Sequence, residues 1–167
     1  MKIAIASGKG GTGKTTVATA IACSLNGVTY IDLDVEEPNG ALILKPEIEK
    51  IIEAKVWIPD FNVDMCTFCE KCSEKCRFNA LLVIPKKKTI KIFNELCHSC
   101  KVCQTVCPSS AIIQGEKKIG VIREGKFNGN KFIDGYLNIG EAMSPPLISI
   151  VKKSINGDGD NIKIIDC

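Results

Sequence analysis

Eight of the ten cysteines fall into two runs that share one spacing. In each run, three cysteines are separated by two residues and a fourth follows after three more, and every position recurs 31 residues later. The opening apolar residues lead directly into a glycine-rich loop, which predicts a strand rather than a signal peptide. Metal ligation is therefore favoured over disulfide bonds. The runs are Cys66, Cys69, Cys72 and Cys76, followed by Cys97, Cys100, Cys103 and Cys107.

This spacing resembles that of bacterial-type ferredoxins, which hold two [4Fe–4S] clusters. Thiolates are soft ligands that suit such clusters, and the fourth cysteine of each run binds the cluster of the other run. Structural zinc is the alternative, because it also favours paired cysteines, but three cysteines at strict two-residue gaps argue against it. One cluster is expected on Cys66, Cys69, Cys72 and Cys107, and the other on Cys97, Cys100, Cys103 and Cys76.

A second motif lies near the start of the chain, where residues 8–15 match a Walker A loop. Its glycines allow turns that direct backbone N–H groups at phosphate oxygens, and a helix N-terminus follows. Lys14 is expected to contact the β- and γ-phosphates of ATP, and Thr15 to bind Mg²⁺. A glycine-rich turn without a ligand is the alternative. The predicted nucleotide-binding residues of this loop are Gly8, Lys9, Gly10, Gly11, Thr12, Gly13, Lys14, Thr15 and Thr16.

With its additional lysine, the loop resembles the deviant Walker A motif of the MinD, ParA and nitrogenase iron-protein superfamily. The resemblance implies that Lys9 reaches the partner's phosphates across a nucleotide-sandwiched homodimer. The alternative is that Lys9 only adds charge to its own loop. The resemblance also implies that Asp34 positions the attacking water, that Asn39 belongs to the same switch, and that Asp166 holds Mg²⁺. From the residues alone, Asp34 is equally a cap of the strand end. The catalytic candidates are Lys9, Lys14 and Asp34.

Short apolar runs and helical periodicity surround these motifs and predict a βαβ unit with parallel strands at the start. Strands are expected over 2–7, 28–33, 119–124, 131–137 and 162–165, and helices over 15–25, 41–54 (broken at Pro46) and 144–153. A hairpin is expected over 85–91 and a turn over 156–160. The predicted fold is α/β, a P-loop domain with a mostly parallel sheet over 1–57 and 119–167. An α+β ferredoxin-like domain is inserted at 58–118.

Composition and length narrow the remaining possibilities. The net charge is +3 and only Arg77 and Arg123 are arginines, which argues against a nucleic-acid partner. No apolar run is long enough to predict a membrane span. We expect a cytoplasmic protein of an anaerobic archaeon or bacterium. The superfamily continues well beyond its Walker B aspartate, so we expect the N-terminal portion of a longer protein, with an unpaired apolar edge along the last strand.

Three functions are compatible with both motifs in one chain. The whole sequence resembles MinD-superfamily ATPases that carry an inserted ferredoxin domain, which implies that ATP gates electron delivery from the clusters to a partner protein. The sequence does not identify that redox partner. The second function is an Fe–S assembly or carrier ATPase of the Mrp-like group. The third is a ferredoxin joined to a non-functional ATPase fragment.

Overall fold

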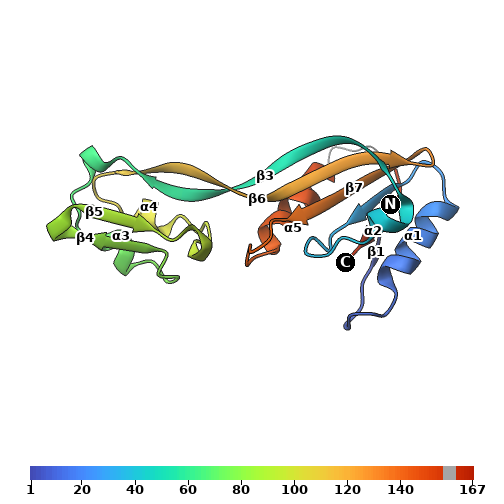
Figure 1. Cartoon of the computed structure of the whole chain (residues 1–167), viewed down its shortest axis with the longest axis horizontal. Coiled ribbons are helices and arrows are strands. Elements are labelled where there is room, and N and C mark those ends of the chain that lie inside the picture. The colour runs from blue at the N-terminus through green and yellow to red at the C-terminus, as the bar shows by residue number, and fades with distance from the viewer. Residues whose placement is uncertain (156–160) are drawn as a thin grey trace. The chain divides into compact units, whose positions relative to one another are not determined.

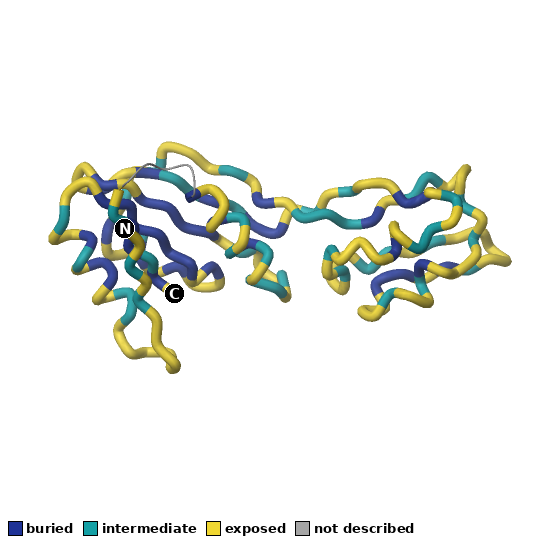
Figure 2. Tube along the Cα trace, turned by 180° about the vertical axis from the view of Figure 1, so that it is seen from behind, coloured by how far each residue is buried: buried dark blue, intermediate teal, exposed yellow. Residues whose placement is uncertain are grey.

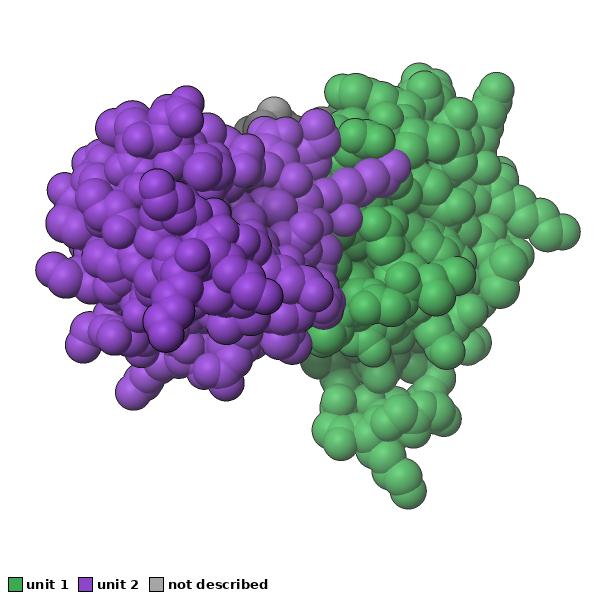
Figure 3. Space-filling model, turned by 60° about the vertical axis from the view of Figure 1, so that its left-hand side comes forward, with its two compact units in different colours: residues 1–54, 119–167 green, residues 55–118 purple. Residues whose placement is uncertain are grey.

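The computed structural model describes residues 1–155 and 161–167 and divides the chain into two compact units (Figure 3). Unit 1 consists of residues 1–54 and 119–167, and unit 2 of residues 55–118. Unit 2 therefore begins three residues before the predicted insertion point at residue 58. The turn predicted over 156–160 lies outside the described residues.

A six-stranded sheet forms the centre of unit 1, in the order β1-β8-β2-β7-β6-β3. The strands β1, β8, β2 and β7 run parallel to one another, and β6 runs antiparallel to β7. Two expectations need correction here. The strands β1 and β2 run parallel but are not neighbours, because β8 lies between them. For the same reason the last strand is paired on both sides and leaves no open edge. The bounds are β1 (Lys2–Ile5), β2 (Thr29–Asp32), β3 (Glu47–Phe61), β6 (Ile112–Phe127), β7 (Asn130–Leu137) and β8 (Lys163–Asp166).

The central strands are buried on both faces, as expected for parallel strands covered by helices (Figure 2). Because side chains alternate along a strand, Tyr30, Phe132 and Ile164 share one face and pack with Ala18 and Ala22 of α1 (Lys14–Ser24). The opposite face contacts Leu147 and Val151 of α5 (Pro145–Ser154), which lie close to Gly135 of β7. The helices predicted over 15–25 and 144–153 are thus confirmed.

One long segment was predicted incorrectly. The helix expected over 41–54 is only a short α2 (Gly40–Leu44), followed by the strand β3. Lys45 adopts a left-handed backbone with φ 46°, and Pro46 cannot continue the helical hydrogen bonds. Hydrogen bonding of β3 to β6 then overrides local preference. The two strands run side by side in Figure 1. They approach so closely that a Cβ on Gly125 would collide with the carbonyl of Glu47.

Unit 2 is built from two copies of one pattern, offset by 31 residues. A short 3-10 helix η1 (Val63–Met65) and helix α3 (Lys71–Glu74) recur as η3 (Asn94–Leu96) and α4 (Val102–Thr105). Between the copies, β4 (Leu81–Ile84), η2 (Pro85–Lys87) and β5 (Thr89–Ile92) form an antiparallel hairpin. The predicted lysine-rich hairpin is therefore confirmed.

Candidate functional site

Three buried aspartates lie side by side on three adjacent strands of unit 1, at the ends of β2 and β8 and within β7. Asp32 of β2 lies in register with Asp134 of β7 on one side and with Asp166 of β8 on the other. All three are at most 1% exposed. Each stands two residues after Tyr30, Phe132 or Ile164 respectively, so strand alternation turns all three towards the face that α1 covers. The carboxyl edge of the sheet therefore carries an acidic row.

Sequence reasoning did not find Asp134. A signal was present, because each of the three strands contains an aromatic or aliphatic residue followed by isoleucine and aspartate: residues 30–32, 132–134 and 164–166. Of these triplets, only residues 164–166 were singled out, through Asp166, and Asp32 was not predicted as a site residue either.

The glycine-rich loop leaves β1 at the same edge, since Ile5 lies in register with Asp166. The loop holds its shape through Ser7, whose hydroxyl donates to the Lys9 carbonyl at 2.8 Å. At Gly13, φ is 83°, a conformation that favours glycine, and α1 starts at the next residue. A Cβ added at Gly8 or Gly10 would meet nothing within 4 Å. Packing within the chain thus does not require these two glycines, and the loop is open to a ligand.

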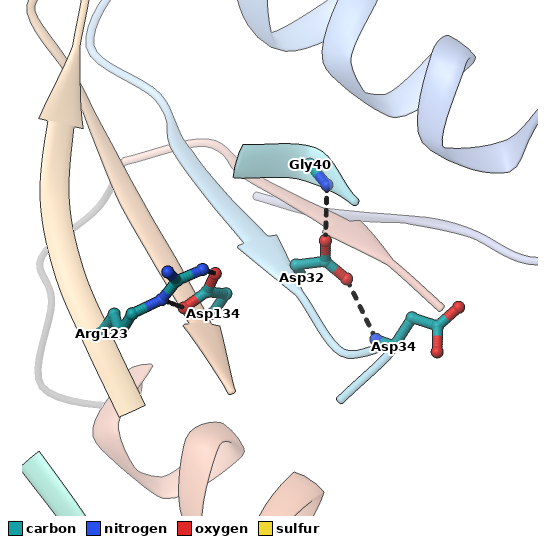
Figure 4. A network of polar contacts seen from close by, with 5 residues as sticks. All are labelled: Asp32, Asp34, Gly40, Arg123 and Asp134. Atoms are coloured by element: carbon teal, nitrogen blue, oxygen red, sulfur yellow. Dashed lines mark hydrogen bonds and ion pairs between the residues drawn. The ribbon is translucent and has the colours of Figure 1, made fainter. Parts of the chain in front are cut away.

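Asp32 holds both ends of the segment that follows β2 (Figure 4). Its two carboxylate oxygens accept the backbone N–H groups of Asp34 and Gly40, each at 3.0 Å. Burial raises the pKa of Asp32 to about 7; the two amide donors lower it, and the charges of Asp166 and Asp134 raise it. One carboxyl group that titrates near neutral pH therefore fixes residues 34–40.

Asp134 has its own cation. The guanidinium of Arg123, directly opposite on β6, donates from Nε to Oδ1 at 2.9 Å and from Nη2 to Oδ2 (Figure 4). Arg123 also lies over the ring of Tyr136, 4.8 Å from its centroid. This ion pair raises the pKa of Arg123. Neither Arg123 nor Asp134 was predicted as a site residue, because their pairing depends on strand register.

The predicted nucleotide residues are only partly brought together. Lys14 and Asp34 line one pocket at the carboxyl edge, and Cys167 lines it too. Asn39 instead precedes α2 and lines a different pocket, shared with Arg123. Among the remaining predicted residues, Thr15 is half-buried, Lys9, Thr16 and the rest of the loop are exposed, and Asp166 accepts the Tyr30 hydroxyl at 3.1 Å.

In unit 2, the eight paired cysteines line two pockets, four to each. Each pocket contains three cysteines of one run and the fourth cysteine of the other run. Burial and the neighbouring thiols of Cys107 and Cys66 raise the pKa of Cys72, which places thiols of both runs together. One pocket (pocket A) is lined by Cys66, Cys69, Cys72 and Cys107, and the other (pocket B) by Cys76, Cys97, Cys100 and Cys103.

The backbone around the pockets repeats as closely as the cysteines do. Six non-glycine residues have positive φ at matched positions. Strain of this kind in L-residues concentrates at functional sites. Backbone amides donate to sulfur in the first copy, from Phe68 to Cys66 at 3.4 Å and from Ala80 to Cys76 at 3.3 Å. The six are Phe68, Glu70 and Asn79, and 31 residues later Ser99, Lys101 and Ser110.

Within residues 1–155 and 161–167, no three cysteine, histidine or acidic side chains form a group suited to a metal ion. Over the same ranges, none of the helices has both the length and the apolar character needed to traverse a bilayer.

Comparison with known proteins identifies the family. Residues 3–159 match the CobQ/CobB/MinD/ParA nucleotide binding domain, CbiA. The chain belongs to this family. As in other open α/β sheets, the loop and acidic row of this nucleotide-binding domain lie at the carboxyl ends of the strands, where ligands bind.

Two relatives come from Methanocaldococcus jannaschii. The uncharacterized protein MJ0578 is 33% identical over 170 residues, which cover 99% of this chain and 59% of the relative. The uncharacterized protein MJ0579 is 30% identical over 169 residues, covering 99% and 60% respectively. The chain thus spans about three fifths of the length of these curated relatives.

Proposed function

We propose that this nucleotide-binding domain binds ATP with Mg²⁺ and couples that binding to electron transfer from two [4Fe–4S] clusters in unit 2 to a partner protein. One observation carries the proposal. The two four-cysteine pockets combine residues of both runs in the crossed pattern that two-cluster ferredoxins use, in a chain that also has an open phosphate loop.

The nucleotide half of the proposal assigns roles to residues at the carboxyl edge of the sheet. Backbone N–H groups of residues 8–15 hold the phosphates, with Lys14 at the β- and γ-phosphates. Thr15 and Asp166 hold Mg²⁺, whose preferred ligands are oxygens. Asp34, which shares a pocket with Lys14, orients the attacking water. Lys9 is exposed and free of packing constraints that would prevent it from reaching a second copy of the chain.

The cysteine half fits the cluster chemistry. A [4Fe–4S] cluster supplies one-electron redox chemistry when bound. The four cysteines of each pocket would hold one such cluster through their thiolates. Each pocket offers four thiols, and backbone amides already donate to the sulfurs of Cys66 and Cys76. Hydrogen bonds of this kind stabilise the negative charge of a ligated sulfur.

Because the relatives are longer than this chain, the activity of the whole protein is something that we propose. We place ATP hydrolysis in a homodimer in which two nucleotides are sandwiched between the phosphate loops. The redox partner is a protein of unspecified identity. Asp32 supports the coupling, since it fixes both ends of the segment that carries Asp34 and Asn39.

The test is a redox titration of anaerobically prepared protein with and without MgATP. We expect about eight iron atoms per chain, from two clusters of four. MgATP should shift the midpoint potential of at least one cluster, and Lys14→Ala should remove that shift while retaining iron. Stoichiometric zinc in place of iron would overturn the cluster assignment. Identical potentials with and without MgATP would favour a ferredoxin with a silent nucleotide domain. Transfer of the clusters to an apo-acceptor would favour an assembly function.

A further inference from the structure

The two cysteine pockets differ at one position beside their crossing ligand. Cys76 and Cys107 are matched positions of the two runs, and two residues beyond them stand Phe78 and Ser109. Phe78 lines pocket B and Ser109 lines pocket A. The repeat therefore places an aromatic ring in one pocket where it places a hydroxyl in the other.

Ser109 places a hydroxyl beside the sulfur of the crossing ligand, and a ligated Cys107 thiolate, which has no proton, can only accept from it. Its Oγ lies 3.7 Å from Sγ of Cys107. In pocket B the amide of Ala80 donates to Cys76 at 3.3 Å, and no hydroxyl stands at the position matched to Ser109, which is Phe78. The hydroxyl is thus an additional donor on the pocket A side.

Pocket B has an aromatic pair at its surface instead. The rings of Phe78 and His98 stack with centroids 3.6 Å apart and an interplanar angle of 8°. The residue matched to His98 is Thr67, which lines pocket A. The stack covers part of pocket B with two rings. Lys101 lines pocket B and the matched Glu70 lines pocket A, but both side chains are exposed, so solvent screens their charges.

A reduced cluster carries one more negative charge than an oxidised one, and part of this charge resides on the ligating sulfurs. A hydroxyl that donates to sulfur stabilises the added charge, whereas an apolar cover does not. On the basis of the proposed function, we propose that Ser109 makes pocket A the site that holds the electron when the protein carries only one.

The experiment is a reductive titration monitored by electron paramagnetic resonance on the full chain with its iron loaded. The wild-type protein should show two waves whose occupancies differ at least tenfold at a given potential, or about 59 mV for a one-electron step. Ser109→Ala should lower the higher potential by about 59 mV and leave the lower potential unchanged. Ser109→Thr, which keeps the hydroxyl, should preserve both waves.

A second variant tests the other pocket independently. Phe78→Ser gives pocket B the residue of pocket A and should raise the lower potential, whereas Phe78→Leu should not. Coincident wild-type waves, or a Ser109→Ala titration identical to wild type, would overturn this inference alone. A protein that binds no iron under anaerobic reconstitution would overturn the proposed function, and the inference with it.

Discussion

Removing the guanidinium of Arg123 should destabilise unit 1 strongly. Asp134 is fully buried and its carboxylate accepts two hydrogen bonds from Arg123. Removing one partner of a buried ion pair costs about 3–5 kcal/mol, because a charge remains without compensation. The Arg123 side chain is 24% exposed, which places the expected loss for Arg123→Gln at the lower end, about 3 kcal/mol.

The assay is urea unfolding, followed separately in each unit. Both tyrosines, Tyr30 and Tyr136, lie in unit 1, and the one tryptophan, Trp57, lies in unit 2. Tyrosine absorption therefore reports on the unit that contains the ion pair. With a slope of about 1–3 kcal/mol per M urea, the midpoint for Arg123→Gln should fall by about 1–3 M.

Controls follow from burial. Asp134→Asn should cost less than Arg123→Gln, since the remaining guanidinium can reach solvent while the remaining carboxylate cannot. Lys126→Gln removes an ion pair to Glu49 in which both side chains are about half exposed, and should leave the midpoint unchanged. If Arg123→Gln unfolds at the same urea concentration as Lys126→Gln, the buried pair does not stabilise unit 1 as argued.

Four further predictions concern single sites. Lys14→Ala should abolish nucleotide binding in calorimetry, because it removes the cation that faces the phosphates; retained affinity would contradict the loop assignment. Gly40→Ala should destabilise unit 1 by about 1–3 kcal/mol in urea unfolding, since the new Cβ would collide with the Tyr30 hydroxyl. The pKa of Asp32 is raised to about 7, so the stability that its protonated form contributes should be lost as the pH rises through that value. A free energy of unfolding that does not change with pH over this range would contradict the raised pKa. Cys107→Ala should damage the cluster held by Cys66, Cys69 and Cys72, because Cys107 is its fourth ligand. Spectroscopic loss confined to the other cluster would show that the ligation is not crossed.

The features predicted from sequence are those that short-range signals encode. The phosphate loop, α1 and α5 follow from glycines, helical periodicity and a proline in the first turn. The spacing of the cysteines resembles that of two-cluster ferredoxins, and this resemblance led to the same two sets of four cysteines that line the pockets. All of these depend on neighbours within a few residues or on a repeated spacing.

The missed features depend on which strands become neighbours. The position of β8 between β1 and β2 is a long-range pairing that no local pattern specifies. Residues 47–54 of β3 were predicted as helix because the partner of this strand, β6, lies far along the chain. Asp134 is a site residue only because β7 pairs with β2 in a register that aligns it with Asp32, and Arg123 only because β6 places it opposite Asp134.

The pairing of β3 with β6 bears on how such a chain arises. The polypeptide leaves unit 1 after Ala54 on one of these strands and returns at Ile119 on the other, and the two are hydrogen-bonded neighbours. A chain lacking residues 55–118 would need only a tight turn to join them as a plain hairpin. An ancestral domain could therefore acquire unit 2 through an insertion into a single turn, and every strand of unit 1 would keep its neighbours. The tip of that hairpin is equally a point at which recombination can replace one inserted unit with another.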